Sequence, residues 1–246
     1  MIEIFKKNDQ ADGGFNGGEI LEKRPVGFPQ DGGKLKPYSN LFYWAHAWSD
    51  IGSTIGLHPH QAFEIMTFIL EGEIKHYDTK INKWINLKKG DVQIIRAGNG
   101  VSHAERLESG SQIFQIWFDP NIYESIKKPA SYKDFKKELF KPEISNGASA
   151  ITYVGPGSPV TMDSDVIIRE IHLKKGGKVF DSQPEYIISI FIIEGEIQIR
   201  DNVLKAGDFI KTSEMEIPLT IIQDSRIFMV FNPVKLNYIT YADKYL

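Results

Sequence analysis

The sequence contains no cysteine among its 246 residues. This absence excludes disulfide bonds, thiolate metal sites and cysteine nucleophiles, and it fits a reducing compartment. No run of about 18 apolar residues is present, which is the length that a membrane-spanning helix needs. The first residues also lack the apolar core of a signal peptide. We therefore expect a cytoplasmic protein that has no membrane partner.

An excess of basic charge is also missing. The formal net charge is −3 and the isoelectric point lies near 6.1. Direct binding to nucleic acid needs a basic face, so the composition argues against a nucleic-acid partner. The remaining composition, 41% hydrophobic and 25% charged, is that of a globular protein. A chain of this length can form one large domain or two modest ones.

Short apolar segments separated by turn residues follow one another in the first half of the chain: Leu41–Trp48, Phe63–Leu70, Ile74–Asp78, Trp84–Leu87, Val92–Ile95 and Ile113–Phe118. Strands at such intervals are typical of a β-sandwich or a small barrel. The character changes over residues 119–146, where prolines flank the lysine-rich run Tyr132–Phe140. We predict a linker there, with one short helix over this run.

The strand pattern returns after the linker. Phe191–Asp201 matches Phe68–Asp78 at seven of eleven positions, and Lys205–Asp208 repeats the turn Lys88–Asp91. Two copies of one β unit are the natural inference.

Two pairs of potential metal ligands stand out in the first copy. They are His58 and His60, separated by one proline, and His103 and Glu105, separated by one alanine. In a β-strand residues i and i+2 point to the same face, so two neighbouring strands would direct all four groups into one small volume. Three imidazoles and a carboxylate suit a first-row divalent ion such as iron, copper, nickel, manganese or zinc.

The second copy lacks these four residues. Counting along the chain from the shared turns places other side chains at the corresponding positions: Asp181, Gln183, Thr220 and Ile222. We therefore predict a metal-binding domain over residues 1–120, a linker over 121–146 and a degenerate domain without metal over 147–246.

Three further residues have predicted roles near these pairs. Glu64 is an even number of positions from His58 and His60, so on one continuous strand it would point to the same face. We expect it to orient an imidazole, with direct ligation as the alternative. His46 lies among aromatic residues and is expected to be packed or hydrogen-bonded. His76, whose counterpart is Ile199, is expected in the core or on the sheet surface rather than in the chemistry.

These motifs resemble the cupin superfamily and, within it, the pirin family. The first pirin motif is similar to His58–Glu64 followed by Leu70–Glu73, and the second is similar to three segments: Gly90–Gln93, Ala97–Gly100 and His103–Glu105. The resemblance implies an all-β bicupin, with two cupin-type β-barrels joined by a short helical linker and with metal in the N-terminal barrel. It implies that the ligands are His58, His60, His103 and Glu105. The ion is usually Fe(II), and Cu, Ni, Mn or Zn are the alternatives.

The resemblance implies two kinds of function. Some members open the flavonol quercetin with dioxygen, so we expect a metal-dependent dioxygenase, an oxidoreductase of the quercetin 2,3-dioxygenase type. Its substrate would be a small flavonol-like enol, and Glu105 would be the catalytic group that accepts the substrate's hydroxyl proton. Other members are nuclear transcription cofactors, so the alternative is a non-enzymatic metal-binding regulator with a protein partner. Sugar-phosphate isomerisation, a third activity of cupin scaffolds, lacks an evident phosphate-binding cluster.

Overall fold

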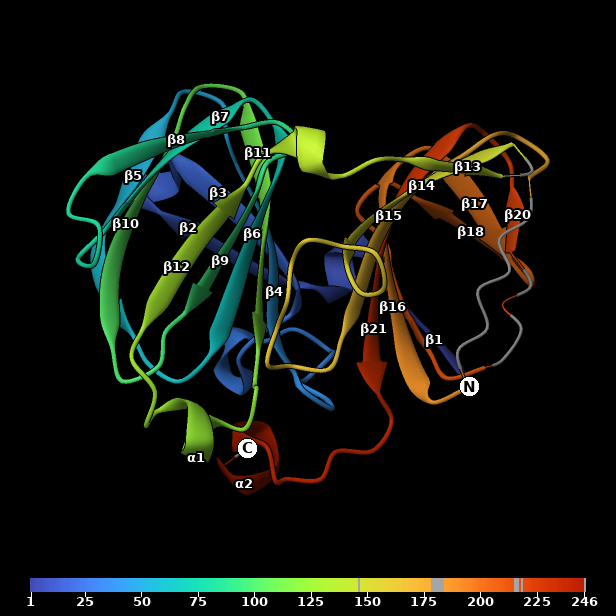
Figure 1. Ribbon diagram of the computed structural model, residues 1–246. Helices are drawn as coiled ribbons and strands as arrows, with labels where there is room; N and C mark the ends of the chain where they lie inside the picture. The colour runs from blue at the N-terminus through green and yellow to red at the C-terminus, as the bar shows by residue number, and fades with distance from the viewer. Residues whose placement is uncertain (146, 178–183, 215–216, 218, 246) are drawn as a thin grey trace. The chain divides into compact units, whose positions relative to one another are not determined.

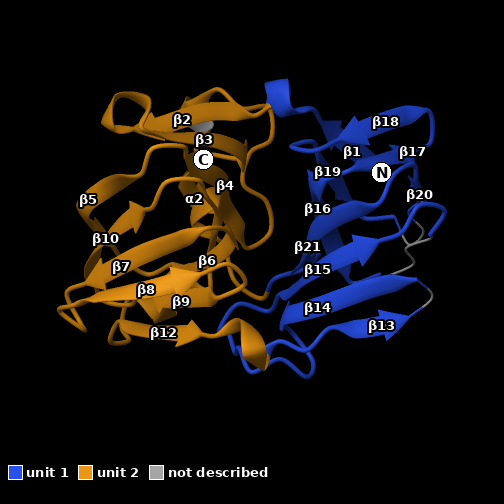
Figure 2. Ribbon diagram, turned by 90° about the horizontal axis from the view of Figure 1, so that it is seen from above, with its two compact units in different colours: residues 1–9, 140–236 blue, residues 10–139, 237–246 orange. Residues whose placement is uncertain are grey.

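The computed structural model describes residues 1–145, 147–177, 184–214, 217 and 219–245. The described chain is built mainly of β-strands, as predicted (Figure 1). It forms two compact units (Figure 2). The N unit contains Gln10–Leu139 and Asn237–Leu246, and the C unit contains Met1–Asp9 and Phe140–Leu236. Each unit therefore includes a short segment from the opposite end of the chain.

The N unit contains two antiparallel sheets. The larger sheet has the order β12-β9-β6-β11-β4-β3-β2. Its strands are β2 (Ala11–Phe15), β3 (Ile20–Val26), β4 (Leu41–Ser49), β6 (Glu64–Glu71), β9 (Val92–Arg96), β11 (Ser111–Phe118) and β12 (Ser131–Phe135). The smaller sheet has the order β5-β10-β7-β8. Its strands are β5 (Ser53–His60), β7 (Glu73–Asp78), β8 (Trp84–Lys88) and β10 (Val101–Leu107).

The C unit repeats this design. Its larger sheet has the order β1-β19-β16-β21-β15-β14-β13, and its smaller sheet has the order β18-β17-β20. The strands of the larger sheet are β1 (Ile2–Phe5), β13 (Glu143–Ser145), β14 (Ala148–Val154), β15 (Ile167–Leu173), β16 (Tyr186–Glu194), β19 (Phe209–Thr212) and β21 (Ser225–Pro233). Those of the smaller sheet are β17 (Glu196–Ile199), β18 (Asn202–Lys205) and β20 (Leu219–Ile221).

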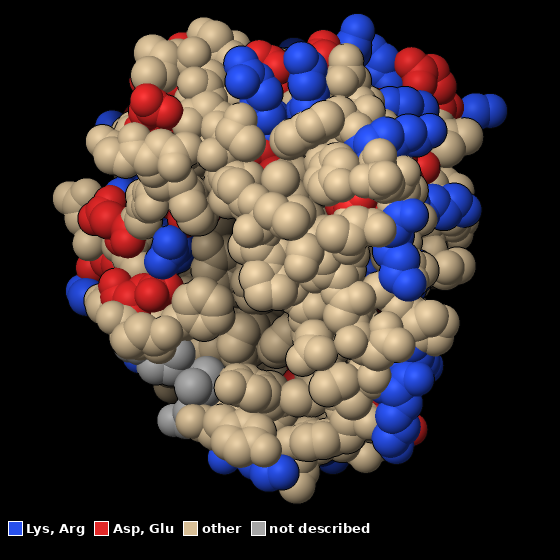
Figure 3. Space-filling model, turned by 90° about the vertical axis from the view of Figure 1, so that its left-hand side faces the viewer, with Lys and Arg blue, Asp and Glu red and all other residues tan. Residues whose placement is uncertain are grey.

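The helical elements of the described chain are short. They are α1 (Ile122–Ser125), α2 (Tyr241–Tyr245) and the 3-10 turns Lys7–Asp9, Asn16–Gly18, Pro29–Asp31 and Lys137–Leu139. None of the helices in the described ranges has the length and apolarity to cross a membrane. The face in Figure 3 has a centre of mostly uncharged side chains, with charged ones mainly toward its edges.

The interior of the N unit changes from apolar to polar along its strands. One end is closed by a buried cluster from both sheets that includes Ile69, Ile74, Leu107 and Ile113. Two residues further along the same strands, and therefore on the same face, are polar side chains: Thr67, His76, Glu105 and Gln115. The barrel thus has an apolar floor with a polar layer above it.

The C unit is apolar where the N unit is polar. Its sheets have the same register, since Ile227 pairs with Ile192 as Ile113 pairs with Ile69. On this register the N unit's polar residues Thr67, His76, Gln93 and Gln115 correspond to Ile190, Ile199, Ile210 and Met229. These four apolar residues all belong to the C unit's buried core.

The register also corrects two predicted correspondences. Glu105 lies opposite His76 in the N unit, and Leu219 lies opposite Ile199 in the C unit, so Leu219 rather than Ile222 is the counterpart of Glu105. The same offset replaces Thr220 by Ile217 as the counterpart of His103. Counting from the Gly-Asp turn failed because Glu105 follows Asp91 by 14 residues, whereas Leu219 follows Asp208 by only 11. Asp181 and Gln183 lie outside the described residues.

The lysine-rich run in the predicted linker is not one helix. Ser131–Phe135 forms β12, an edge strand that pairs with β9, and only Lys137–Leu139 turns as a 3-10 helix. At the end of β12, Asp91 accepts hydrogen bonds from the backbone N–H of Lys137 at 3.0 Å and the ammonium of Lys136 at 2.8 Å. Strand pairing and this anchor fix an extended conformation that outweighs helix propensity. The α-helical turn in this segment is α1, which precedes β12.

The chain's N-terminus supplies the same edge strand to the C unit. β1 pairs with β19 as β12 pairs with β9, and a Phe-Lys-Lys sequence ends both strands. Asp208 accepts hydrogen bonds from the Lys7 N–H at 3.0 Å and the Lys6 ammonium at 3.1 Å. It also accepts one from the Lys205 N–H at 3.0 Å. The first nine residues therefore complete the C unit rather than the N unit.

We predict that Asp208→Ala destabilises the C unit. Asp208 is 6% exposed, and its loss leaves the backbone N–H groups of Lys7 and Lys205 without their acceptor. The free energy of unfolding should fall by about 1–3 kcal/mol in urea denaturation. Asp201→Ala, at an exposed turn position, is the control and should change it little. Equal effects of the two substitutions would contradict the anchoring role of Asp208.

Candidate metal centre

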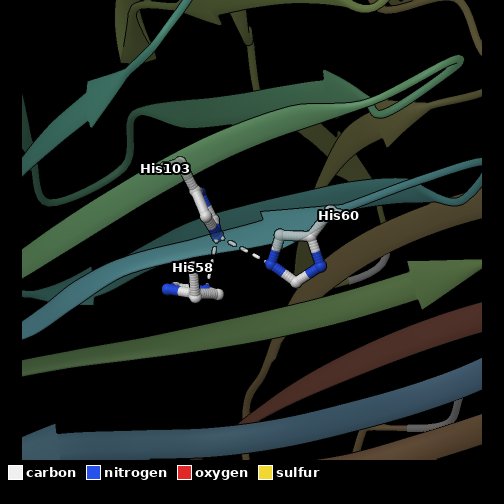
Figure 4. A group of neighbouring side chains, drawn as sticks. All are labelled: His58, His60 and His103. Carbon is white, nitrogen blue, oxygen red and sulfur yellow. Dashed lines mark hydrogen bonds between the residues drawn. The ribbon is translucent and has the colours of Figure 1, made fainter.

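Two neighbouring strands bring the three predicted histidine ligands together. His58 lies directly opposite His103 in the antiparallel pair of β5 and β10, and His60 lies opposite Val101. Because His58 and His60 are two residues apart on one strand, both side chains emerge on the same side. Figure 4 shows the three imidazoles pointing toward one another.

The nitrogens of this triad are too close to be explained by hydrogen bonds alone. His103 Nε2 lies 2.9 Å from His60 Nε2 and 2.9 Å from His58 Nε2. An imidazole nitrogen carries either one hydrogen or one lone pair, so His103 Nε2 can form only one such bond. Two nitrogens at right angles on an ion with 2.1 Å bonds would be about 3.0 Å apart. The triad therefore fits a metal ion.

The tautomer of His58 is fixed in the form that binds metal. Its Nδ1 lies 2.8 Å from the carbonyl oxygen of Gly56, which can only accept a hydrogen bond. Nδ1 therefore carries the hydrogen and donates it, and Nε2 presents its lone pair to the other two imidazoles. Such a second hydrogen bond is the usual way in which a histidine ligand is oriented.

Glu105 lies beside this triad on β10 but not within it. The strand has an irregularity between His103 and Glu105 where it pairs with β5. The ligand atoms of Glu105, His103 and His76 all lie within 4.8 Å of one another, which makes a second, fully buried group that shares His103 with the triad. Glu105 accepts a hydrogen bond from Gln115 Nε2 at 2.7 Å, and its other oxygen, Oε1, has no hydrogen-bond partner among the described residues.

Glu64 does not follow the parity from which its role was predicted. The turn after His60 contains Ala62 with a φ of 66°, and Glu64 then begins β6 in the other sheet. Its buried carboxylate forms an ion pair with Arg96 at 3.2 Å. Neither group of potential ligands in the described chain contains Glu64. The prediction for Glu64 was wrong because a turn separates β5, which carries His58 and His60, from β6, which carries Glu64.

His46 is packed and hydrogen-bonded, as predicted. Its ring contacts Trp48 and Phe114, and its Nε2 lies 3.4 Å from the amide oxygen of Gln112. It belongs to neither group of potential ligands in the part of the chain that the structure describes.

Similar known proteins identify the family of this chain. The pirin family model matches residues 35–118. A putative quercetin 2,3-dioxygenase of Zymomonas mobilis is 32% identical over 186 residues, which cover 74% of this chain and 77% of that protein. The chain belongs to the pirin family.

Other relatives show how far the likeness extends. Pirin-1 of Arabidopsis thaliana is 30% identical over 145 residues, which cover 56% of this chain and only about half (50%) of that protein. The pirin YhhW of Escherichia coli, solved in complex with nickel(II), superimposes with a TM-score of 0.78 at 22% identity. The match covers 95% of this chain and 99% of that one, and it confirms the predicted bicupin fold.

Burial keeps two histidines of this pirin neutral. Burial, with the neighbouring imidazoles of His103 and His58, lowers the pKa of His60 to about 3. Burial, with His58 and His76, lowers the pKa of His103 to about 2. A neutral imidazole is the form that binds a metal ion, so burial keeps both histidines in that form at neutral pH.

His76 of this pirin lies beside the site, although its position in the sequence did not predict this. It is fully buried in the core, as predicted, but its ring centroid lies 5.4 Å from that of His103. Its Nε2 lies 3.2 Å from the carboxylate of Asp78, and its ring stacks on Tyr132. The sequence feature that could have indicated this position is a third pair of potential ligands two residues apart, His76 and Asp78. This pair lies on β7, the strand next to β10.

We predict a pH-dependent loss of stability in the chelator-treated protein. The unfolded chain protonates these histidines near the ordinary pKa of 6.5, whereas the folded chain does so near 3 or below. The unfolded state therefore binds more protons between these values, and the free energy of unfolding falls as the pH drops from 6.5 toward 3. Each histidine contributes up to about 1.4 kcal/mol per pH unit.

Urea denaturation at pH 7 and pH 5 measures this effect. The double variant His60→Gln, His103→Gln retains the other titrating groups and should lose less stability between the two pH values. If both proteins lose the same amount, the two histidines do not carry the effect.

Proposed function

We propose that the N unit of this pirin binds one divalent metal ion through His58, His60, His103 and Glu105, with Fe(II) as the ion in the cell. The observation that carries this proposal is the 2.9 Å approach of His103 Nε2 to two other imidazole nitrogens. The nickel(II) complex of the related Escherichia coli pirin supports a divalent ion. Glu105 would complete the set by turning its free Oε1 toward the triad, which offsets part of the ion's charge.

The metal is assigned to the N unit alone. The C unit has apolar side chains where the N unit has its polar layer, and Ile217 and Leu219 stand where the N unit has His103 and Glu105. Such side chains offer no ligand atom. The domain organisation proposed here is therefore one metal-binding barrel and one degenerate barrel, with the first nine residues in the latter.

The activity that fits this site is that of an oxidoreductase, a dioxygenase acting on a flavonol-like enol. A bound ion would supply a Lewis acid that favours the deprotonated form of a chelating enol. The name of the Zymomonas mobilis relative, a putative quercetin 2,3-dioxygenase, supports this class of substrate.

Aromatic side chains next to the triad suit a flat substrate. The indole of Trp117 meets the His60 ring edge to face at a centroid distance of 4.8 Å. Tyr43, Phe28 and Phe63 surround Trp117 at centroid distances of 4.9, 5.9 and 6.1 Å. These rings pack on one another in one cluster, so the wall beside His60 is aromatic, and a flat aromatic ligand can contact such a wall through stacking or ring edges.

Glu105 is the group proposed to accept the substrate's hydroxyl proton. Its Oε1 is buried and has no hydrogen-bond partner in the described chain, whereas Oε2 is held by Gln115. A carboxylate can accept a proton at an oxygen whose lone pairs are not occupied by hydrogen-bond donors. The proton would move from the enol hydroxyl to the Glu105 carboxylate as the enol becomes an enolate.

We predict that His103→Ala lowers metal affinity strongly. It removes the imidazole that contacts both other histidines, so Ni(II) affinity in calorimetric titration should fall by at least about 10-fold. His46→Ala is the matched control, since His46 lies outside both groups of potential ligands in the described residues. If His103→Ala retains wild-type affinity, His103 is not a ligand.

We predict that the metal-loaded protein consumes dioxygen with quercetin. Protein loaded with Fe(II), Cu(II) or Ni(II) should bleach the flavonol absorbance under air and should not do so without dioxygen. Intact metal binding without turnover in any of the three forms would contradict the dioxygenase. That result would favour the non-enzymatic regulator, whose metal state alters a protein-binding surface.

A further inference from the structure

Two side chains of β11 form a hydrogen-bonded chain that ends at Glu105. The indole Nε1 of Trp117 donates to the amide oxygen of Gln115 at 3.0 Å. The amide Nε2 of Gln115 donates to Glu105 Oε2 at 2.7 Å. Gln115 and Trp117 are two residues apart on one strand, so both face the barrel interior.

The direction of these hydrogen bonds is set by the indole. An indole N–H can only donate, so the Gln115 atom that faces Trp117 must be the amide oxygen. The amide nitrogen then faces Glu105 and must donate to it. A flipped amide would place its oxygen against the carboxylate and its N–H group against the indole N–H. Trp117 thus fixes the amide of Gln115, and Gln115 fixes one oxygen of Glu105.

Trp117 also contacts the histidine side of the site. The Trp117 ring meets His60 at a centroid distance of 4.8 Å and an interplanar angle of 84°. The pair therefore touches Glu105 at one end and His60 at the other. With Oε2 held, Oε1 is the oxygen of Glu105 that has no partner in the described residues.

The C unit shows what replaces this pair where the ligands are missing. On the shared register of the two larger sheets, Gln115 corresponds to Met229 and Trp117 to Phe231. Met is close to Gln in size and Phe keeps an aromatic ring, but neither replacement has the amide or indole group that forms these hydrogen bonds. The hydrogen-bonded chain is therefore dispensable for a barrel of this design, and a role in packing does not explain it.

We propose that Gln115 and Trp117 are positioning residues of the metal centre. They hold Glu105 by Oε2 so that only Oε1 binds the ion, and Trp117 sets the tilt of the His60 ring. This inference rests on the proposed metal site. Without the Gln115 amide, Glu105 rotates freely and binds the ion more weakly and with a different geometry.

The test uses substitutions that the C unit already tolerates. Gln115→Met and Trp117→Phe copy Met229 and Phe231. The first nearly keeps the side-chain volume, the second keeps a smaller aromatic ring, and each removes the hydrogen bonds of the side chain that it replaces. Gln112→Met is the matched control, because Gln112 lies on the same strand and contacts His46 instead of the site. The full-length proteins are titrated with Co(II), whose visible absorption bands report the number and geometry of its ligands.

Gln115→Met should lower Co(II) affinity by about 10-fold or more and change the visible spectrum. Trp117→Phe should change the spectrum in the same direction and lower affinity less, because Gln115 still reaches Glu105. Gln112→Met should match the wild type. Thermal unfolding of each metal-free variant, followed by circular dichroism, verifies that the fold is retained.

Two results would overturn the inference, and they differ in what they imply for the metal site. If Gln115→Met and Trp117→Phe both bind Co(II) with the wild-type spectrum and affinity, while His103→Ala does not bind it, the metal site stands and the positioning role fails. If the wild-type protein itself binds no Co(II), both the metal site and the positioning role fail.

Discussion

The convergence of three imidazole nitrogens on one point is the constraint on which the site depends. His103 Nε2 cannot form hydrogen bonds to His58 and His60 at the same time, and burial prevents His60 and His103 from becoming charged at neutral pH. Three lone-pair donors this close are stabilised by a cation. The hydrogen bond from His58 to Gly56 shows that the surrounding backbone already supports this arrangement.

The barrel makes this arrangement possible by dividing its interior into layers. Apolar side chains close one end of the barrel, and the polar layer begins two residues further along the same strands. The C unit uses the same turns, register and Phe-Lys-Lys edge strand with an apolar interior throughout the corresponding positions. The comparison of the two units separates the residues that build the fold from those that build the site. Gln115 belongs to the second kind because its counterpart is Met229.

Much of the fold and of the metal site could be predicted from the sequence, because ligand pairs two residues apart and internal repeats can both be recognised without knowing the fold. The pairs at His58 and His103 predicted a shared face, and the repeat predicted two similar units. The errors arose where partners distant in sequence decide the outcome. The run after Ser131 forms a strand because β9 and Asp91 hold it, and no local pattern shows those partners. The prediction for Glu64 assumed one continuous strand from His58, but the turn at Ala62 ends that strand and places Glu64 in the other sheet.

The most direct measurement is anomalous diffraction from crystals of the Ni(II)-loaded protein, recorded on both sides of the nickel absorption edge. The account predicts one strong peak in the N unit, within bonding distance of Nε2 of His58, His60 and His103 and of Glu105 Oε1, with the Gln115 amide still on Oε2. A peak in the C unit, or a peak away from the three imidazoles, would contradict it.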